Sequence, residues 1–177
     1  MRSFRLALAQ VNPTVGDIIG NTKIVLERIE EAREYQADLV AFPELMITGY
    51  PPEDLLLKAS FIRDNQNALA KVISAAKGIT VVTGFVDSVG NNIYNAASVA
   101  HNGQLVGTYH KIHLPNYGVF DELRYFKSGN ICPVYNINGV NVGINICEDI
   151  WFPQGPVPVQ REAGAKIIVN INGSPFH

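Results

Sequence analysis

Three reactive side chains, those of Glu44, Lys111 and Cys147, directly follow segments that have the pattern of strands. Loops that leave the ends of strands project from a rigid sheet, and catalytic groups often lie there. Each residue alone is weak evidence, since surface carboxylates, loop lysines and small buried cysteines are ordinary features. Glu148 and Asp149 follow Cys147. We expect both to lie outside the core, because carboxylates are seldom fully buried, and this favours a functional turn.

Taken together, the three residues suit nucleophilic attack on a carbonyl carbon. A free cysteine titrates near roughly pH 8.5, so at neutral pH a base must take the thiol proton. Glu44 can take it and pass it to a leaving amine. Lys111 and the backbone N–H of Glu148 can stabilise the negative oxygen of the tetrahedral intermediate. The second cysteine, Cys132, lacks such neighbours, which favours a structural role.

The first 42 residues predict a strand, a helix and a second strand. Residues 4–9 alternate in polarity with Phe4, Leu6 and Leu8 on one face, and this favours a strand. Asp17 or Asn21 can cap a helix that continues to about Gln36. The continuous apolar run that follows, over residues 39–42, is typical of a strand buried on both sides.

The middle of the chain predicts a second helix followed by three strands. Ser60 can cap the helix, and Gly78 supplies its C-terminal stop. A strand rich in β-branched residues follows over residues 79–86. Turn signals then separate two further strands, at residues 93–100 and 104–111.

The last part of the chain predicts a hairpin, a short helix and a final strand. An Asn-Gly turn joins residues 133–137 to residues 140–146, and this pair supplies the two positive-φ positions of a type I′ turn. Residues 156–163 favour a short helix, and residues 166–171 favour a buried strand. The order of elements indicates a mixed, layered α/β architecture.

Composition excludes several classes of function. The chain has 177 residues, with 14 Lys and Arg against 16 Asp and Glu, so it lacks the basic footprint of a nucleic-acid binder. No apolar run is long enough to span a membrane, and the N-terminus lacks a signal-peptide pattern. Two cysteines and four histidines show neither a disulfide scaffold nor metal-ligand spacing. We therefore expect a cytoplasmic chain without a metal.

Three motifs resemble those of the nitrilase, or carbon–nitrogen hydrolase, superfamily. They are Phe-Pro-Glu-Leu at residues 42–45, Tyr-His-Lys-Ile-His-Leu at 109–114 and Gly-Ile-Asn-Ile-Cys-Glu at 143–148. The resemblance covers the whole chain in order, and three motifs in the right sequence are far more specific than one. It implies an α/β fold, the four-layer α-β-β-α sandwich with mixed sheets, incomplete at the C-terminus of this chain.

The same resemblance implies roles for the reactive residues. Glu44 would be the general base, Lys111 the oxyanion stabiliser and Cys147 the nucleophile. Glu122 would match the supporting glutamate of the superfamily.

Four further segments are similar to those of glutamine-dependent NAD synthetases. They lie at residues 48–56, 114–126, 147–151 and 172–176. In that family the N-terminal domain is a glutaminase, which hydrolyses glutamine through a cysteinyl thioester. The ammonia passes to a C-terminal synthetase domain that uses ATP and Mg to amidate deamido-NAD.

This closer resemblance implies a glutamine pocket. Tyr117, Glu148 and Ser174 match positions that hold glutamine, while Tyr50 and Trp151 would line the pocket. Glu148 and Ser174 offer the acidic and hydroxyl partners that a free α-ammonium group needs. Ordinary polarity at strand ends is the alternative interpretation of these residues.

The chain departs from this family in length. We expect residues 1–177 to be the N-terminal portion of the carbon–nitrogen hydrolase domain, with the synthetase domain absent, because no Ser-Gly-Gly-x-Asp-Ser-like phosphate loop occurs. The chain itself should then need no cofactor. The expected partners are L-glutamine, a synthetase domain and further copies of the chain. An incomplete sheet would expose apolar edges.

Two other functions fit the same residues. The chain could be a free-standing amidase or nitrilase that acts on another small amide, carbamoyl compound or nitrile. It could also be a non-catalytic remnant or assembly module that keeps the motifs by descent. Hydrolysis of simple amides faster than glutamine would favour the amidase.

Overall fold

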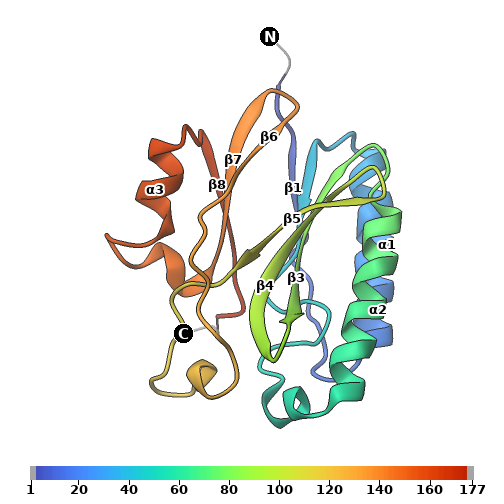
Figure 1. Ribbon diagram of the computed structural model, residues 1–177. Coiled ribbons are helices and arrows are strands. Elements are labelled where there is room, and N and C mark those ends of the chain that lie inside the picture. Colours follow the sequence, from blue (N-terminus) through green and yellow to red (C-terminus); the bar gives the residue numbers. More distant parts are fainter. Residues whose placement is uncertain (1–2, 175–177) are drawn as a thin grey trace.

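Residues 3–174, which the computed structural model describes, form four layers, as Figure 1 shows. Two β-sheets pack face to face in the middle. Helices α1, Ile18–Glu34, and α2, Ala59–Ala75, cover the outer face of one sheet. Helix α3, Pro156–Glu162, covers the outer face of the other. The predicted α-β-β-α arrangement is confirmed for this part of the chain.

The first sheet has the order β1-β2-β3-β4-β5 within the described residues. Strands β1, β2 and β3 run parallel, and β4 and β5 each run antiparallel to the strand before them. Strand β5 therefore runs in the same direction as β2, and the residues that follow these two strands meet at one end of the sheet. The bounds are β1 Leu6–Leu8, β2 Leu39–Ala41, β3 Thr80–Val89, β4 Asn92–His101 and β5 Gln104–His110.

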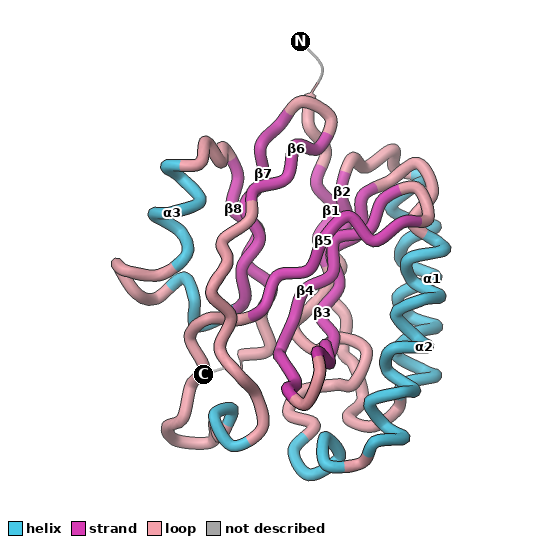
Figure 2. The backbone as a smooth tube through the Cα atoms, viewed as in Figure 1, coloured by secondary structure: helices cyan, strands magenta, loops and turns pink. Residues whose placement is uncertain are grey.

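The second sheet has the order β6-β7-β8 in the described part of the chain (Figure 2). Strands β6, Val134–Ile137, and β7, Val140–Ile146, form the predicted hairpin. Its turn residues Asn138 and Gly139 have φ of 48° and 84°, as a type I′ turn requires. Strand β8, Ile167–Ile171, pairs parallel to β7 after the crossover through α3.

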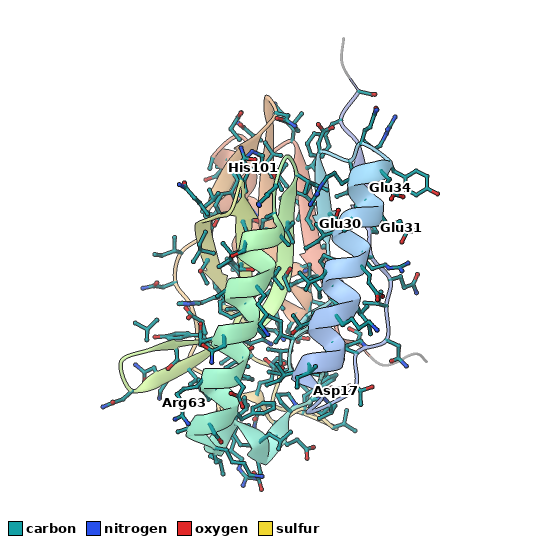
Figure 3. All side chains as sticks on the ribbon, turned by 90° about the vertical axis from the view of Figure 1, so that its right-hand side faces the viewer. Asp17, Glu30, Glu31, Glu34, Arg63 and His101 are labelled. Carbon is teal, nitrogen blue, oxygen red and sulfur yellow. The ribbon has the colours of Figure 1, made fainter. Side chains whose placement is uncertain are left out.

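Helix α1 begins at the predicted cap. The Asp17 carboxylate accepts the N–H of Gly20 at 2.9 Å, and Figure 3 places Asp17 at the N-terminal end of the helix. The predicted inner face is buried against the first sheet and includes Val25 and Ile29. Within residues 3–174, no helix is long and apolar enough to cross a membrane. Acidic side chains project from the opposite, outer face of α1 (Figure 3): Glu30, Glu31 and Glu34.

The start of α2 differs from the prediction. Lys58 occupies the N-cap position without a side-chain hydrogen bond, and Ser60 lies inside the first turn. The predicted Ser60 cap is therefore wrong, because the helix begins at Ala59, two residues before the start that a Ser60 cap would give. Three short 3₁₀ helices within residues 3–174 were not expected, since one or two turns leave no periodic pattern in the sequence. They are η1 Glu53–Leu57, η2 Glu122–Arg124 and η3 Cys147–Ile150.

The two sheets share a buried apolar core, which includes Leu39, Val82 and Ile144. A second core lies between the first sheet and helices α1 and α2. The alternation expected for residues 4–9 holds only in part, because Leu8 is 72% exposed. Strand β1 is a three-residue edge strand with a partner on one side, so the end of the strand lies open to solvent.

Candidate active site

Three of the predicted residues meet in a buried ion-pair cluster. The Lys111 Nζ lies 2.7 Å from Glu44 Oε1 and 2.9 Å from Glu122 Oε1. None of the three residues is more than 4% exposed. The inward-pointing lysine required by the sequence interpretation is therefore present. Charges buried this deeply need partners, and here each carboxylate shares the same ammonium group.

The cluster keeps Lys111 charged. Burial alone lowers the pKa of Lys111, but the carboxylates of Glu44 and Glu122 outweigh burial and raise that pKa above its ordinary value. Burial raises the pKa of Glu122, and the Lys111 ammonium offsets this only in part. A fixed cation beside a carboxylate pair can stabilise an oxyanion that forms next to it.

Glu44 is positioned by the backbone that follows β2. The Phe42 N–H still pairs with the Val82 carbonyl at 2.9 Å, and the chain then turns over Gly84 of β3. A Cβ atom at Gly84 would overlap with the Pro43 carbonyl oxygen and the Leu45 amide nitrogen. The absence of a side chain at this one position therefore lets the Glu44 segment approach the sheet.

Cys147 occupies a sharp turn directly after β7. Its φ is 44°, a left-handed conformation that non-glycine residues adopt at an energetic cost and often at functional sites. The Asn170 amide donates to the Cys147 carbonyl at 3.3 Å and so helps to hold the turn. The thiol is buried, with the Ser174 hydroxyl 3.3 Å from its sulfur. Burial, followed by the Glu44 carboxylate, raises the pKa of the Cys147 thiol to about 11.

The segment after β8 connects the nucleophile to the carboxylate cluster. The Gly173 N–H donates to Glu44 Oε2 at 2.9 Å, and the Glu44 N–H donates to the Asn172 carbonyl at 3.2 Å. The Gly173 amide also lowers the pKa of the Cys147 thiol by hydrogen bonding, against the larger effect of burial. Glu44 therefore lies within the electrostatic reach of the thiol. Residues 175 and 176, the end of the predicted segment 172–176, lie outside the described residues.

The burial of Asp149 contradicts the expectation that both acids after Cys147 lie outside the core. Asp149 is fully buried and Glu148 is 9% exposed. Asp149 is buried because four donors surround its carboxylate, which is how proteins satisfy a buried charge. These donors come from the end of β7, from β5 and from the segment after Lys111: the Ile146 N–H at 3.1 Å, the Tyr109 hydroxyl at 2.7 Å, and the Ile112 N–H at 3.1 Å with the His113 N–H at 2.8 Å.

The residues predicted to hold a ligand lie around this cluster in two groups. The Tyr50 hydroxyl donates to Glu122 Oε1 at 2.9 Å, next to the ion pairs. The Tyr117 hydroxyl donates to the two oxygens of Glu148 at 3.0 and 2.8 Å. Trp151 is 73% exposed, and its place in a pocket stays a prediction.

Asn95 of β4 was not expected at the site. Its side-chain amide donates to Glu44 Oε1 at 2.7 Å, and Asn95 is fully buried. The signal in the sequence is an amide side chain beside the small apolar residues Ala96 and Ala97 in the middle of a strand. That signal alone does not indicate which neighbouring strand end the side chain faces.

The arrangement can perform covalent catalysis on a carbonyl group. It offers a thiol in Cys147, a carboxylate in Glu44 and a cation in Lys111, the kinds of group that such catalysis uses as nucleophile, base and oxyanion stabiliser. Within the described residues, no group of three or more His, Cys, Asp or Glu could hold a metal ion. Cys132 is half-buried, and none of its described interactions is with this cluster.

Comparison with known proteins identifies related sequences. Residues 5–177 match the profile of the carbon–nitrogen hydrolase family. The chain is 47% identical over 180 residues to a protein of Thermotoga maritima named glutamine-dependent NAD(+) synthetase. It is 46% identical over 178 residues to a protein of that name from Xanthomonas campestris. These matches cover 100% and 98% of this chain but 31% and 32% of the relatives, so the chain spans about a third of their length.

Solved structures share the fold. The glutamine-dependent NAD+ synthetase of Acinetobacter baumannii, solved with ADP, matches 99% of this chain and 33% of its own chain, with a TM-score of 0.95 and 40% identity. A mutant of an amidase of the nitrilase superfamily from Nesterenkonia AN1 matches 96% of this chain and 64% of its own. Its TM-score is 0.84 and its identity is 25%.

Proposed function

The chain belongs to the carbon–nitrogen hydrolase family, and on that premise we propose that it is the glutamine-hydrolysing part of a glutamine-dependent NAD synthetase. The observation that carries this proposal is the buried Glu44–Lys111 pair, 2.7 Å apart, beside the thiol of Cys147. Relatives that are 47% and 46% identical over this region carry the name glutamine-dependent NAD(+) synthetase, which supports glutamine as the substrate.

The first half of the reaction forms a thioester. Glu44 takes the proton from the Cys147 thiol, and the sulfur attacks the carboxamide carbon of glutamine. The carbonyl oxygen becomes an oxyanion, which the Lys111 ammonium and the backbone N–H of Glu148 stabilise. The C–N bond then breaks, and Glu44 returns its proton to the leaving NH₂ group, so that ammonia departs and the glutamyl thioester remains.

The second half of the reaction restores the enzyme. A water molecule gives one proton to Glu44 and attacks the thioester carbon, which forms a second oxyanion at the same position. The C–S bond then breaks, and the proton on Glu44 passes to the sulfur of Cys147. Glutamate leaves, so one glutamine and one water yield one glutamate and one ammonia.

Glu148 and Tyr117 give the proposed site a means to select an amino acid. The Glu148 carboxylate is 9% exposed and accepts the Tyr117 hydroxyl on both oxygens. Within residues 3–174, no basic side chain forms an ion pair with Glu148. A carboxylate with so little exposure and no cation favours a ligand that brings one, such as the α-ammonium group of glutamine. The Ser174 hydroxyl, 3.3 Å from the Cys147 sulfur, is the further polar group proposed to contact the bound glutamine.

The rest of the proposed enzyme lies outside this chain. Since the chain spans about a third of its curated relatives, we propose that the ammonia serves an ATP- and Mg-dependent amidation of deamido-NAD in a separate synthetase domain. The expected association of this chain with further copies is part of the same proposal.

A free-standing amidase is the second candidate. The likeness to an amidase of the nitrilase superfamily, with a TM-score of 0.84, favours it specifically. The same Glu44, Lys111 and Cys147 would then act on a small amide without an α-ammonium group, and Glu148 would have no cation to bind.

The test is ammonia release by the purified chain from L-glutamine, acetamide and propionamide, with Cys147→Ala as the control. We expect release from glutamine at a much higher kcat/KM than from either simple amide, and none above background from the control. Faster release from the simple amides would favour the amidase. Folded protein that releases no ammonia from any of the three would favour a non-catalytic remnant.

A further inference from the structure

Asn95 closes a ring of four buried side chains. The Lys111 Nζ bridges the two carboxylates on one side, at 2.7 Å from Glu44 Oε1 and 2.9 Å from Glu122 Oε1. The Asn95 Nδ2 bridges the same two carboxylates on the other, at 2.7 Å from Glu44 Oε1 and 3.4 Å from Glu122 Oε2. One bridge is charged and the other is neutral. We call this set the carboxylate ring.

The backbone of Asn95 also helps to position the lysine. Asn95 lies in β4 opposite Val86 of β3, and its carbonyl accepts the Lys111 N–H at 2.9 Å, directly after β5 ends. A single residue therefore holds the start of the Lys111 loop through its backbone and both carboxylates through its side chain. No other described residue bonds to Glu44, Lys111 and Glu122 together.

The carbonyl oxygen of the Asn95 side chain is buried and has no hydrogen-bond partner in the described part of the chain. Asn65 is equally buried, and the hydrogen bonds of its side chain differ from those of Asn95. Its amide donates to the Val86 carbonyl at 2.6 Å, and its oxygen accepts the Val86 N–H at 3.2 Å. An asparagine that serves stability satisfies both ends, as Asn65 does. Asn95 satisfies only the donor end that faces the ring, which points to a role in the site.

We propose that Asn95 is a positioning residue that keeps Glu44 as the base of the site and Glu122 as its support. The Glu122 oxygens are both engaged, Oε1 by Lys111 and Tyr50 and Oε2 by Asn95. Glu44 Oε2 faces the Gly173 amide beside the nucleophile. Without the Asn95 donor, Glu122 Oε2 loses its partner and can compete for the proton that Glu44 must exchange with Cys147.

This inference deepens the proposed function and rests on it for the role of Glu44, so its test uses a reaction that needs no glutamine. The rate of alkylation of Cys147 by iodoacetamide is measured against pH in the full chain, in a Cys132→Ser background. Removal of a donor disfavours the ionised carboxylates. For Asn95→Leu we expect the acidic limb of the profile, where the carboxylates of the ring take up protons, to move up by about one pH unit.

The matched control is Asn65→Leu, which removes an equally buried amide away from the ring. It should lower the melting temperature and leave the pH profile in place. If Asn95→Leu does not fold, Asn95→Asp carries the same test, because it keeps the volume and replaces the donor with a third carboxylate. It should move the acidic limb at least as far.

Profiles of the folded Asn95 variants that superimpose on that of the parent would overturn the proposal. A displaced profile in a chain that releases no ammonia from glutamine would leave the role of Asn95 intact and reject only the substrate. Rapid hydrolysis of glutamine together with superimposed profiles would support glutamine as the substrate and reject the role of Asn95.

Discussion

At the scale of single residues, the proposed chemistry depends on whether Cys147 or Glu44 holds one proton. Burial and the Glu44 carboxylate raise the pKa of the Cys147 thiol to about 11, so the resting nucleophile is protonated at neutral pH. Lys111 stays charged between its two carboxylates. The proposed reaction therefore needs Glu44 as an acceptor within reach, and this arrangement differs from cysteines that a neighbouring cation ionises in advance.

Replacement of Glu44 with glutamine tests this requirement. Glu44→Gln keeps the shape of the side chain but cannot take the thiol proton, so kcat for ammonia release should fall about a thousandfold. The control is Glu53→Gln, which changes an exposed carboxylate. A kcat for Glu44→Gln within a few-fold of the parent would show that another group is the base.

The raised pKa of Cys147 also predicts a loss of stability in alkali. A thiol in the unfolded chain has a pKa of about 8.5, whereas burial raises the pKa of the folded Cys147 thiol to about 11. Between these values the folded state holds a proton that the unfolded state has lost, so the free energy of unfolding falls as pH rises.

Urea unfolding at intervals from neutral pH to alkaline pH measures this effect. In Cys147→Ser the free energy of unfolding should fall by about 3 kcal/mol less over this pH range than in the parent. The Cys132→Ser substitution removes a half-buried thiol and should change the alkaline fall in the free energy of unfolding by less than Cys147→Ser does. Parallel curves for the parent and Cys147→Ser would contradict the raised pKa.

At the scale of elements, the site is assembled from strand ends. Glu44 follows β2, Lys111 follows β5 and Cys147 follows β7. Strands β2 and β5 run in the same direction, so their C-terminal ends lie at one end of the sheet. The hydrogen bond from the Glu44 N–H to the Asn172 carbonyl connects the residues that follow β2 to those that follow β8.

A methyl group at Gly84 should displace the Glu44 segment. Gly84→Ala brings a Cβ atom into the backbone of residues 43–45. We expect a loss of about 2 kcal/mol in the free energy of unfolding and about a hundredfold in kcat/KM, because the base moves relative to the thiol. The comparison is Gly90→Ala, where φ is 60° and a Cβ atom would meet no neighbour. It should cost about 1 kcal/mol without loss of activity, and equal activities of the two variants would refute the argument.

The parts of the fold that the sequence predicts are those with a local signal. The α1 cap at Asp17 and the Asn138-Gly139 turn are examples, since each depends on neighbours within a few residues. Gly84 and Asn95 were missed because their roles come from other strands, through a register that no local pattern contains. Burial of Asp149 was missed for the same reason, since three of its four donors come from β5 and the segment that follows β5.

At the scale of the whole molecule, the site crosses the boundary between the two sheets. Glu44, Lys111 and Asn95 belong to the first sheet and its loops, and Cys147 and Gly173 follow strands of the second. The geometry of the site therefore depends on the core that the two sheets share. The outer helices cover the faces that lie away from this core (Figure 1).

Truncation of the shared core should weaken the fold and the site together. Ile144 is fully buried between the sheets. Ile144→Ala should lower the free energy of unfolding by about 3 kcal/mol and reduce activity as the sheets shift. Val106→Ala, at a side chain that is 55% exposed, should cost less than about 0.5 kcal/mol. Full activity in a destabilised Ile144→Ala protein would show that the site does not depend on the packing between the sheets.

The most direct test of the central claim, that Cys147 attacks the carboxamide carbon of glutamine, is covalent labelling. The chain is incubated with a diazoketone analogue of L-glutamine, and the modified residue is identified by peptide mass spectrometry. The account predicts one label per chain, on Cys147, that excess L-glutamine prevents and Cys147→Ala abolishes. A folded chain whose Cys147 reacts with iodoacetamide but never with the analogue would contradict it.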